Sequence, residues 1–354
     1  MPVTQRLRPL FAAYQPAPIN DAGAPPFPAF EADEEAEDSA TEGLDLDYER
    51  PQANWAPVAS GVPTADVPVR FIDGSVATRT AGSLLVRGRR RPLIAAVVSA
   101  AALELDGRVL KRPAGARTQK LLCLYSDGME KDDLVEAKHT LRTIGVELRE
   151  RPSGAVTGDF DMMRRATRSL AMDEMEQMER AVLLEDPHKP TLVDGLLERR
   201  LAATPSHDVP VVGLVKRQMT SYLPPALQEM TYSLQPGERT PAFVLRTVQH
   251  VDLVNTYVRL SAQTGASPSY GIVRVTVPLD YVERAHTERV SAYLSGLAGY
   301  LYRLRHRDLA YSRSGISVEP IVRVETHLHA ILPEIDSLIP RLHRLFRGIP
   351  ETVA

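Results

Sequence analysis

Two aspartates stand in the same local setting and could do chemistry together. Asp73 and Asp194 each follow a short apolar run rich in β-branched residues, and each precedes a glycine. Such a run predicts a strand, and a carboxylate at the end of a buried strand is held at the rim of a sheet, where the glycine lets the backbone turn away. On neighbouring strands the two carboxylates could share a divalent ion, because Mn²⁺ and Mg²⁺ prefer oxygen ligands. The alternative is ordinary turn chemistry, since Asp-Gly is a common turn dipeptide.

Further candidate ligands lie on a predicted helix and near the C-terminus. Residues 159–184 have apolar residues at helical spacing and include Glu174 and Glu176, either of which could supply a third carboxylate. These two glutamates lie about 200° apart around a helix, so at most one of them faces the sheet. His327 forms a His-x-His pair with His329, which is not a zinc signature. A solvated acidic face and a structural histidine are the alternative interpretations.

The pattern of apolar residues predicts the elements that would position these side chains. Apolar runs separated by turns predict an antiparallel meander over residues 67–125. Strands and helices then alternate, which predicts an α/β fold with a mixed sheet covered by helices. We expect further strands at 191–193, 209–215, 242–246, 257–260 and 271–277. We expect helices at 131–144, 159–184, 196–203, about 283–307 and about 325–346. The apolar stripe of the helix at 283–307 could pack in the core or form a dimer contact.

The N-terminal 66 residues differ in composition from the rest of the chain. Residues 1–68 hold 11 of the 28 prolines, and residues 31–50 hold ten acidic residues and one basic residue. The net charge of the whole chain is −3, so the remainder is mildly basic. We expect residues 1–66 to form a largely disordered acidic tail and residues 67–348 to form the folded domain. The acidic run could serve solubility, or it could cover a basic groove as a mimic of DNA.

Composition excludes several classes of protein. No apolar run approaches the roughly 20 residues that cross a bilayer, so we expect no membrane association. The first residues lack the apolar core of a secretion signal, which indicates a cytoplasmic protein. The single cysteine, Cys123, excludes an intramolecular disulfide framework and a cysteine-based zinc site. Its apolar neighbours predict a buried, unreactive thiol.

Five motifs occur in order along residues 67–346. They are Ile72-Asp73-Gly74-Ser75, Leu192-Val193-Asp194-Gly195 preceded by an acidic helix, and the stretches 211–217, 272–278 and 319–330. Together they resemble the NurA family of DNA nucleases. The last stretch is similar to the family pattern Tyr-Pro-x-x-Leu-x-x-Ala-His-x-x-Ala, with Pro320, His327 and Ala330 in register. Glu319 stands at the position of the family tyrosine, and Thr326 stands at that of the alanine before the histidine.

This resemblance implies an RNase H-like mixed sheet flanked by helices and the activity of a metal-dependent deoxyribonuclease. The residues implied to bind Mn²⁺ or Mg²⁺ and to act in catalysis are Asp73, Glu174 or Glu176, Asp194 and His327. His327 would be a metal ligand or a general acid/base. Glu174 and Glu176 both fit the family spacing before Asp194, whereas Glu179 lies too close. The basic residues Lys216 and Arg217, after a core strand, could contact the DNA backbone.

The resemblance also implies partners. The family is typically dimeric and works with HerA, a hexameric ATPase that translocates DNA. We therefore expect a 5′–3′ exonuclease, a single-strand endonuclease, or both, acting with a HerA-type ATPase in DNA end processing or anti-phage defence. One alternative is a catalytically weak or inactive adaptor that binds such an ATPase and DNA. Another is an RNase H-like enzyme that acts on RNA or on mobile-element DNA.

Overall fold

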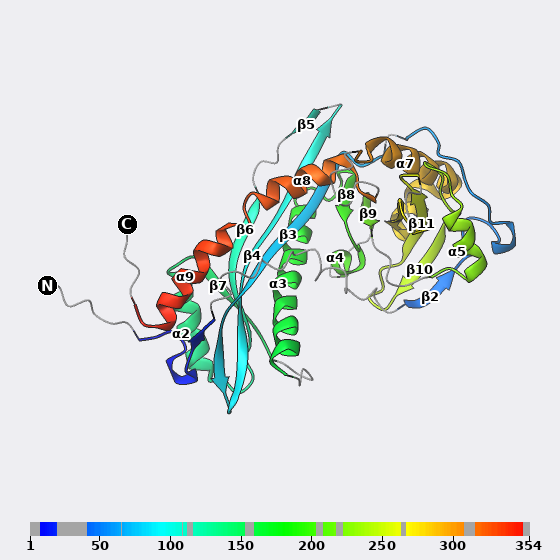
Figure 1. The fold of residues 1–354 in the computed structure, drawn as a ribbon. Coiled ribbons are helices and arrows are strands. Elements are labelled where there is room, and N and C mark those ends of the chain that lie inside the picture. The colour runs from blue at the N-terminus through cyan, green and yellow to red at the C-terminus, as the bar shows by residue number, and fades with distance from the viewer. Residues whose placement is uncertain are drawn as a thin grey trace.

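One mixed sheet runs through the whole protein (Figure 1). The computed structural model describes residues 8–19, 41–64, 66–107, 109–111, 116–152, 159–202, 208–216, 222–262, 267–307 and 316–349. Within these ranges twelve strands join in the order β2-β10-β11-β12-β9-β8-β3-β4-β6-β7, with β1 paired to β3 and β5 paired to β4. The predicted α/β class, a mixed sheet flanked by helices, is therefore confirmed.

A long meander forms the centre of this sheet. Strands β3 (Arg70–Val86) and β4 (Arg89–Asp106) pair antiparallel around a two-residue turn, in which Arg87 and Gly88 both have positive φ. Strand β6 (Arg117–Tyr125) pairs antiparallel with β4, as the sequence predicts. Strand β3 does not end before Asp73 as expected, because β4 is long enough to continue pairing with it on both sides of that residue.

Parallel strands extend the meander on both sides. Strand β8 (Thr191–Asp194) lies parallel to β3, and β9 (Val211–Val215) lies parallel to β8. On the other side, β7 (Val146–Arg151) lies parallel to β6. The remaining strands complete the sheet beyond β9 or pair at its margins: β12 (Ile272–Pro278), β11 (Leu253–Arg259), β10 (Phe243–Thr247), β2 (Thr41–Asp45), β1 (Ala17–Pro18) and β5 (Val109–Lys111).

Helices cover both faces of the central strands. Helix α3 (Phe160–Leu183) packs on Ile72 and Val76 of β3, through Val182, Leu170 and Met175. Helices α8 (Glu319–His329) and α9 (Glu334–Phe346) pack on the opposite face, where Phe71 and Ala77 lie. The other α-helices in the described ranges are α2 (Lys131–Arg142), α4 (Glu198–Leu201), α5 (Pro225–Tyr232), α6 (Leu279–His286) and α7 (Val290–Leu304). None of the helices described is long and apolar enough to cross a membrane.

The two long helices expected near the C-terminus are each divided. Helices α6 and α7 are separated by a 3-10 turn at Thr287–Arg289, where His286 leaves the helical conformation and its ring stacks on Tyr293 at 3.9 Å. The apolar stripe of α7 is buried in the core, so core packing accounts for it. Helices α8 and α9 are separated before Pro333, which disfavours a helical conformation of the residue preceding it.

The structure differs from the expected N-terminal tail in the parts that it describes. Residues 8–19 supply Leu10, Phe11 and Tyr14 to the core, and β1 pairs with β3. Residues 41–64 begin with β2, which pairs with β10. The most acidic part of the run, residues 31–40, lies outside the described residues.

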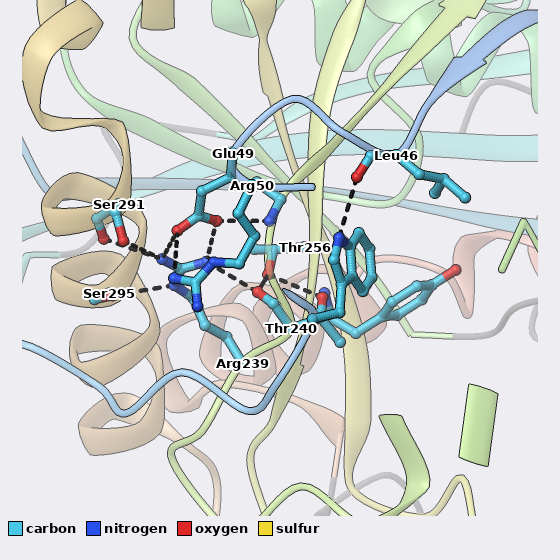
Figure 2. Close-up of polar contacts among 11 residues, drawn as sticks. Leu46, Glu49, Arg50, Arg239, Thr240, Thr256, Ser291 and Ser295 are labelled. Atoms are coloured by element: carbon cyan, nitrogen blue, oxygen red, sulfur yellow. Dashed lines mark hydrogen bonds and ion pairs between the residues drawn. The ribbon is translucent and has the colours of Figure 1, made fainter. Parts of the chain in front are cut away.

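A buried ion pair attaches residues 41–64 to the sheet (Figure 2). The fully buried guanidinium of Arg239 donates two hydrogen bonds of 2.7 Å to the carboxylate of Glu49, one to each oxygen. It also donates to Ser291 and Ser295 of α7, and the backbone N–H of Ala242 donates to Glu49. Burial by itself raises the pKa of Glu49, but the hydrogen bonds and charge of Arg239, with the hydrogen bonds of Ser291 and Ala242, together outweigh it and hold this pKa at about 2. Ionised Glu49 therefore stabilises the fold.

Replacing Glu49 tests this attachment. Because the pKa of Glu49 is about 2 in the folded protein and 4.5 when unperturbed, its contribution is complete above pH 4.5 and falls as the pH drops towards 2. We expect Glu49→Gln to lower the free energy of unfolding by about 3 kcal/mol at pH 7 and by less at pH 3. Urea denaturation at both pH values measures this, with exposed Glu42→Gln as the control. Equal stability of Glu49→Gln and the wild type at pH 7 would contradict the assignment.

Candidate functional site

The pairing of β3 with β8 brings Asp73 and Asp194 side by side. Phe71 lies opposite Leu192 and Ile72 lies opposite Val193, so the same register sets Asp73 beside Asp194. Both carboxylates point to one face, because side chains at matching positions of neighbouring strands share a face. This is the face covered by α8, since Phe71 packs on that helix and Ile72 packs on α3. The expected neighbourhood of the two acids is thus present, although Asp73 lies inside its strand.

Lys216 completes this group from the next strand. It follows β9 and lies two residues beyond Leu214, the register partner of Asp194, so it shares the face of the two aspartates. Its Nζ lies 2.6 Å from Oδ2 of Asp194, and the side chains are only 6% and 15% exposed. In this structure Lys216 is buried against Asp194, and its predicted contact with DNA stays a prediction. Arg217 lies outside the described residues.

Helix α8 contributes a third carboxylate, Glu325. This residue is 5% exposed and lies on the same stripe of the helix as Ile321, Val324 and Leu328, which pack in the core. Its charge acts on both Asp73 and Lys216. We call Asp73, Asp194, Lys216 and Glu325 the carboxylate–lysine cluster. Its four members come from β3, the end of β8, the position after β9, and α8.

Burial and charge set the protonation of the cluster. Burial, with the neighbouring charges of Asp194 and Glu325, raises the pKa of Asp73 well above its usual range, and Lys216 opposes this rise. Burial lowers the pKa of Lys216, but Asp194, Glu325 and Asp73 together outweigh it and raise the pKa. The lysine is therefore an ammonium ion at neutral pH. It supplies the positive charge that a group of buried carboxylates requires.

A separate ion pair lies on the opposite side of β3. Glu179 of α3 is 2% exposed and accepts a hydrogen bond of 2.7 Å from Nε of Arg200 in α4. Burial raises the pKa of Glu179 to about 7, while Arg200 acts in the opposite direction. A β-carbon at Gly74 would lie 2.6 Å from Oε1 of Glu179, so only glycine lets the helix approach this closely. Glu179 thus lies directly across the strand from the cluster.

The two glutamates expected on α3 have other partners. Glu174 lies 2.7 Å from Nη2 of Arg149 on β7, which is three strands away from β3 in the sheet. Glu176 lies 3.4 Å from Nη1 of Arg199. The structure therefore brings neither of them to Asp73, and it places Glu179 nearest to that residue along α3.

His327 of α8 lies on a different side of the helix from Glu325. His327 is half-buried, and in a helix it lies about 200° around the axis from Glu325. Glu319, at the position of the family tyrosine, lies 2.5 Å from Nδ1 of His306 and accepts a hydrogen bond of 2.6 Å from Arg323. The hydrogen bonds from His306 and Arg323 outweigh burial and lower the pKa of Glu319. This carboxylate therefore ties the start of α8 to the end of α7.

Sequence reasoning missed Glu325, Glu179 and Arg200. For the two glutamates a signal was present, because each lies on the mostly apolar stripe of its helix. A carboxylate at a core position is rarely fully buried unless it is paired. Such a position is therefore a stronger candidate than an acid on an exposed face. For Arg200 we find no such signal, since α4 has only four residues.

The cluster has the donor type of a hard divalent cation, although its oxygens are not already arranged around a metal position. Its oxygens come from three carboxylates, which is the ligand type of Mg²⁺ and Mn²⁺. The ammonium of Lys216 stands among them as a cation of the chain itself. In the described part of the chain, no group of three or more carboxylate, imidazole or thiol side chains is already arranged around a metal position. Cys123 is buried, and burial raises the pKa of its thiol to about 12, as expected for an unreactive cysteine.

Comparison with known proteins gives no assignment. No model of a protein family matches the chain, and no curated protein matches it significantly.

Gly74 can be tested as the contact that sets the distance between α3 and β3. In Gly74→Ala the added carbon meets Oε1 of Glu179 at 2.6 Å and Cγ of Met175 at 2.7 Å. We expect the free energy of unfolding to fall by about 1–3 kcal/mol, because this core contact must move apart. Urea denaturation measures the change. Gly43→Ala is the matched control, since its nearest atoms lie at 3.4 Å or more. Equal effects of the two substitutions would show that the contact at Gly74 is loose.

Proposed function

We propose that this chain is a metal-dependent DNA nuclease that hydrolyses phosphodiester bonds with Mn²⁺ or Mg²⁺. The observation that carries the proposal is the juxtaposition of Asp73 and Asp194 on two parallel strands, with the buried Glu325 of α8 acting on Asp73 through its charge. Burying three carboxylates on one face of a sheet costs free energy unless a cation neutralises them. A divalent ion is the cation that such oxygen donors bind best.

The order of the elements supports the same proposal. An antiparallel meander of β3, β4 and β6 is followed by α2 and β7, then by α3, and then by two strands parallel to β3. This sequence of elements agrees with an RNase H-like core, which the resemblance to the NurA family implies. The two aspartates stand on the first and second of the three parallel neighbours β3, β8 and β9.

The chemistry follows from the cluster. A bound divalent ion would lower the pKa of a coordinated water and neutralise charge that develops on the scissile phosphate. Asp73, Asp194 and Glu325 would hold the ion. Lys216 orients the carboxylate of Asp194 through their contact of 2.6 Å. Burial of the cluster keeps bulk water away and strengthens each of these interactions. His327 as ligand or general acid/base stays a prediction from the resemblance alone.

The partners proposed are DNA, a HerA-type hexameric ATPase and a second copy of the chain. They rest on the resemblance to the NurA family. In this proposal the nuclease acts in DNA end processing or anti-phage defence, as a 5′–3′ exonuclease, a single-strand endonuclease, or both. Contacts to phosphates, including the one proposed for Arg217, would make DNA binding salt-sensitive and largely independent of sequence.

A second function is favoured by two specific observations. Lys216 already supplies a cation to the carboxylates, and Glu319 replaces the family tyrosine with a group tied to His306 and Arg323. Both fit an adaptor with little or no nuclease activity that binds a HerA-type ATPase and DNA. Such an adaptor would not cleave DNA with any metal ion, either alone or with its partner.

Cleavage of end-labelled linear DNA separates these functions. We expect the wild type to cleave with Mn²⁺ and not with EDTA, and Asp194→Asn to lower the rate roughly 100-fold or more. Asp173→Asn is the matched control, because Asp173 is an acid of α3 whose partner, Arg151, is half-exposed. The assay is repeated with the ATPase added, which identifies an activity that depends on the partner. Full activity of folded Asp194→Asn would contradict the nuclease proposal, and inactivity of the wild type in both assays would favour the adaptor.

A second comparison asks which residue of α8 serves the site. Glu325 is buried beside Asp73, whereas His327 lies on another side of the helix. We expect Glu325→Gln to lower the cleavage rate at least about tenfold more than His327→Gln. Initial rates at saturating Mn²⁺ measure this. A larger loss in His327→Gln would contradict the placement of Glu325 in the catalytic site.

A further inference from the structure

The cation that the structure shows among the carboxylates is the side chain of Lys216. Its ammonium touches Asp194, and its charge interacts with Glu325 and Asp73. We propose that Lys216 is a built-in competitor of the divalent ion: it neutralises the cluster when no metal is bound and lowers the affinity of the cluster for metal. This inference rests on the proposed function insofar as both place a divalent ion at this cluster.

The geometry gives the lysine this role. The ammonium of Lys216 lies 2.6 Å from Oδ2 of Asp194, and the charges of Glu325 and Asp73 also act on it. The lysine side chain is 6% exposed, so bulk solvent does little to screen its charge. A divalent ion bound by Asp194 would therefore lie close to the ammonium in a medium of low dielectric constant. Two cations at such a distance repel each other strongly.

The side chain of Lys216 is also flexible enough to move away from Asp194 when a metal binds. Its ammonium stands at the end of a flexible stem with four carbons, unlike the rigid fork of an arginine. It is attached immediately after β9, where regular pairing with β12 and β8 ends. The nearby pair of Glu179 and Arg200 is different, because Arg200 is fixed by hydrogen bonds to Glu179 and to the carbonyl of Leu196. Lys216 is thus the cationic side chain of this region suited to exchange with a metal.

A consequence is that folding does not depend on metal. Removing one partner of a buried group of charges leaves the others uncompensated. In the wild type Lys216 provides the compensation, so the fold tolerates the metal-free state. Without the lysine charge, the cluster should both bind a divalent ion more tightly and depend on it for stability.

Binding of Mn²⁺ alone, in the absence of DNA, tests the inference. Two variants remove the charge: Lys216→Met keeps the length of the side chain, and Lys216→Gln keeps a hydrogen-bond donor for Asp194. We expect both to bind Mn²⁺ at least about tenfold more tightly than the wild type by isothermal titration calorimetry. Added Mn²⁺ should also raise the melting temperature more in the variants than in the wild type. Arg199→Met is the control, because Arg199 pairs with Glu176 outside the cluster.

The outcomes are distinct. Tighter binding by the variants, or folding of a variant only when Mn²⁺ is present, supports the competition. Affinity equal to or below that of the wild type contradicts it, and so does failure of both variants to fold even with Mn²⁺. If the variants bind Mn²⁺ more tightly and the wild type cleaves no DNA, the competition stands and the proposed nuclease function fails. If cleavage requires Mn²⁺ and the variants bind Mn²⁺ no more tightly than the wild type, the proposed nuclease function stands and the competition fails.

Discussion

The parallel pairing of β3 with β8 is the constraint on which the site depends. It sets two carboxylates at adjacent positions on one buried face. Ionising both of them there costs free energy, because they repel each other and water does not screen the repulsion. The fold meets this cost by bringing Lys216 from the next strand and by covering the group with α8. Glycine at position 74 then allows α3 to pack closely on the other face. Strand pairing, helix packing and charge thus all act on residues 73 and 74 of β3.

The buried ion pair of Arg239 and Glu49 has a structural role. The ion pair of Arg239 and Glu49 joins residues 41–64 to α7 (Figure 2). Arg239 donates hydrogen bonds to both oxygens of Glu49 and to Ser291 of α7. The carboxylate–lysine cluster differs, because three buried carboxylates interact there with one another and with the charge of Lys216. That gathering of carboxylates makes the cluster a candidate site for a divalent ion, whereas in the other pair the two oxygens of Glu49 are each bonded to Arg239.

Local patterns predicted much of the fold and half of the candidate site. The meander, the strands that carry the two aspartates, and helix α3 follow from apolar periodicity, which reports burial directly. Glu325 and Glu179 were missed because the choice among acids on a helix depends on which face the sheet covers. The break between α6 and α7 falls at His286, whose ring stacks on Tyr293. Pairing of β2 with β10 joins segments about 200 residues apart, which no local pattern encodes.

The most direct test of the account is a crystal structure of the protein with Mn²⁺, measured at the manganese absorption edge. We expect one or more anomalous difference peaks among Asp73, Asp194 and Glu325, within about 2–2.5 Å of their carboxylate oxygens. We also expect the ammonium of Lys216 to have moved away from Asp194. A structure at saturating Mn²⁺ with no peak at these residues, and with Lys216 still on Asp194, would contradict both expectations.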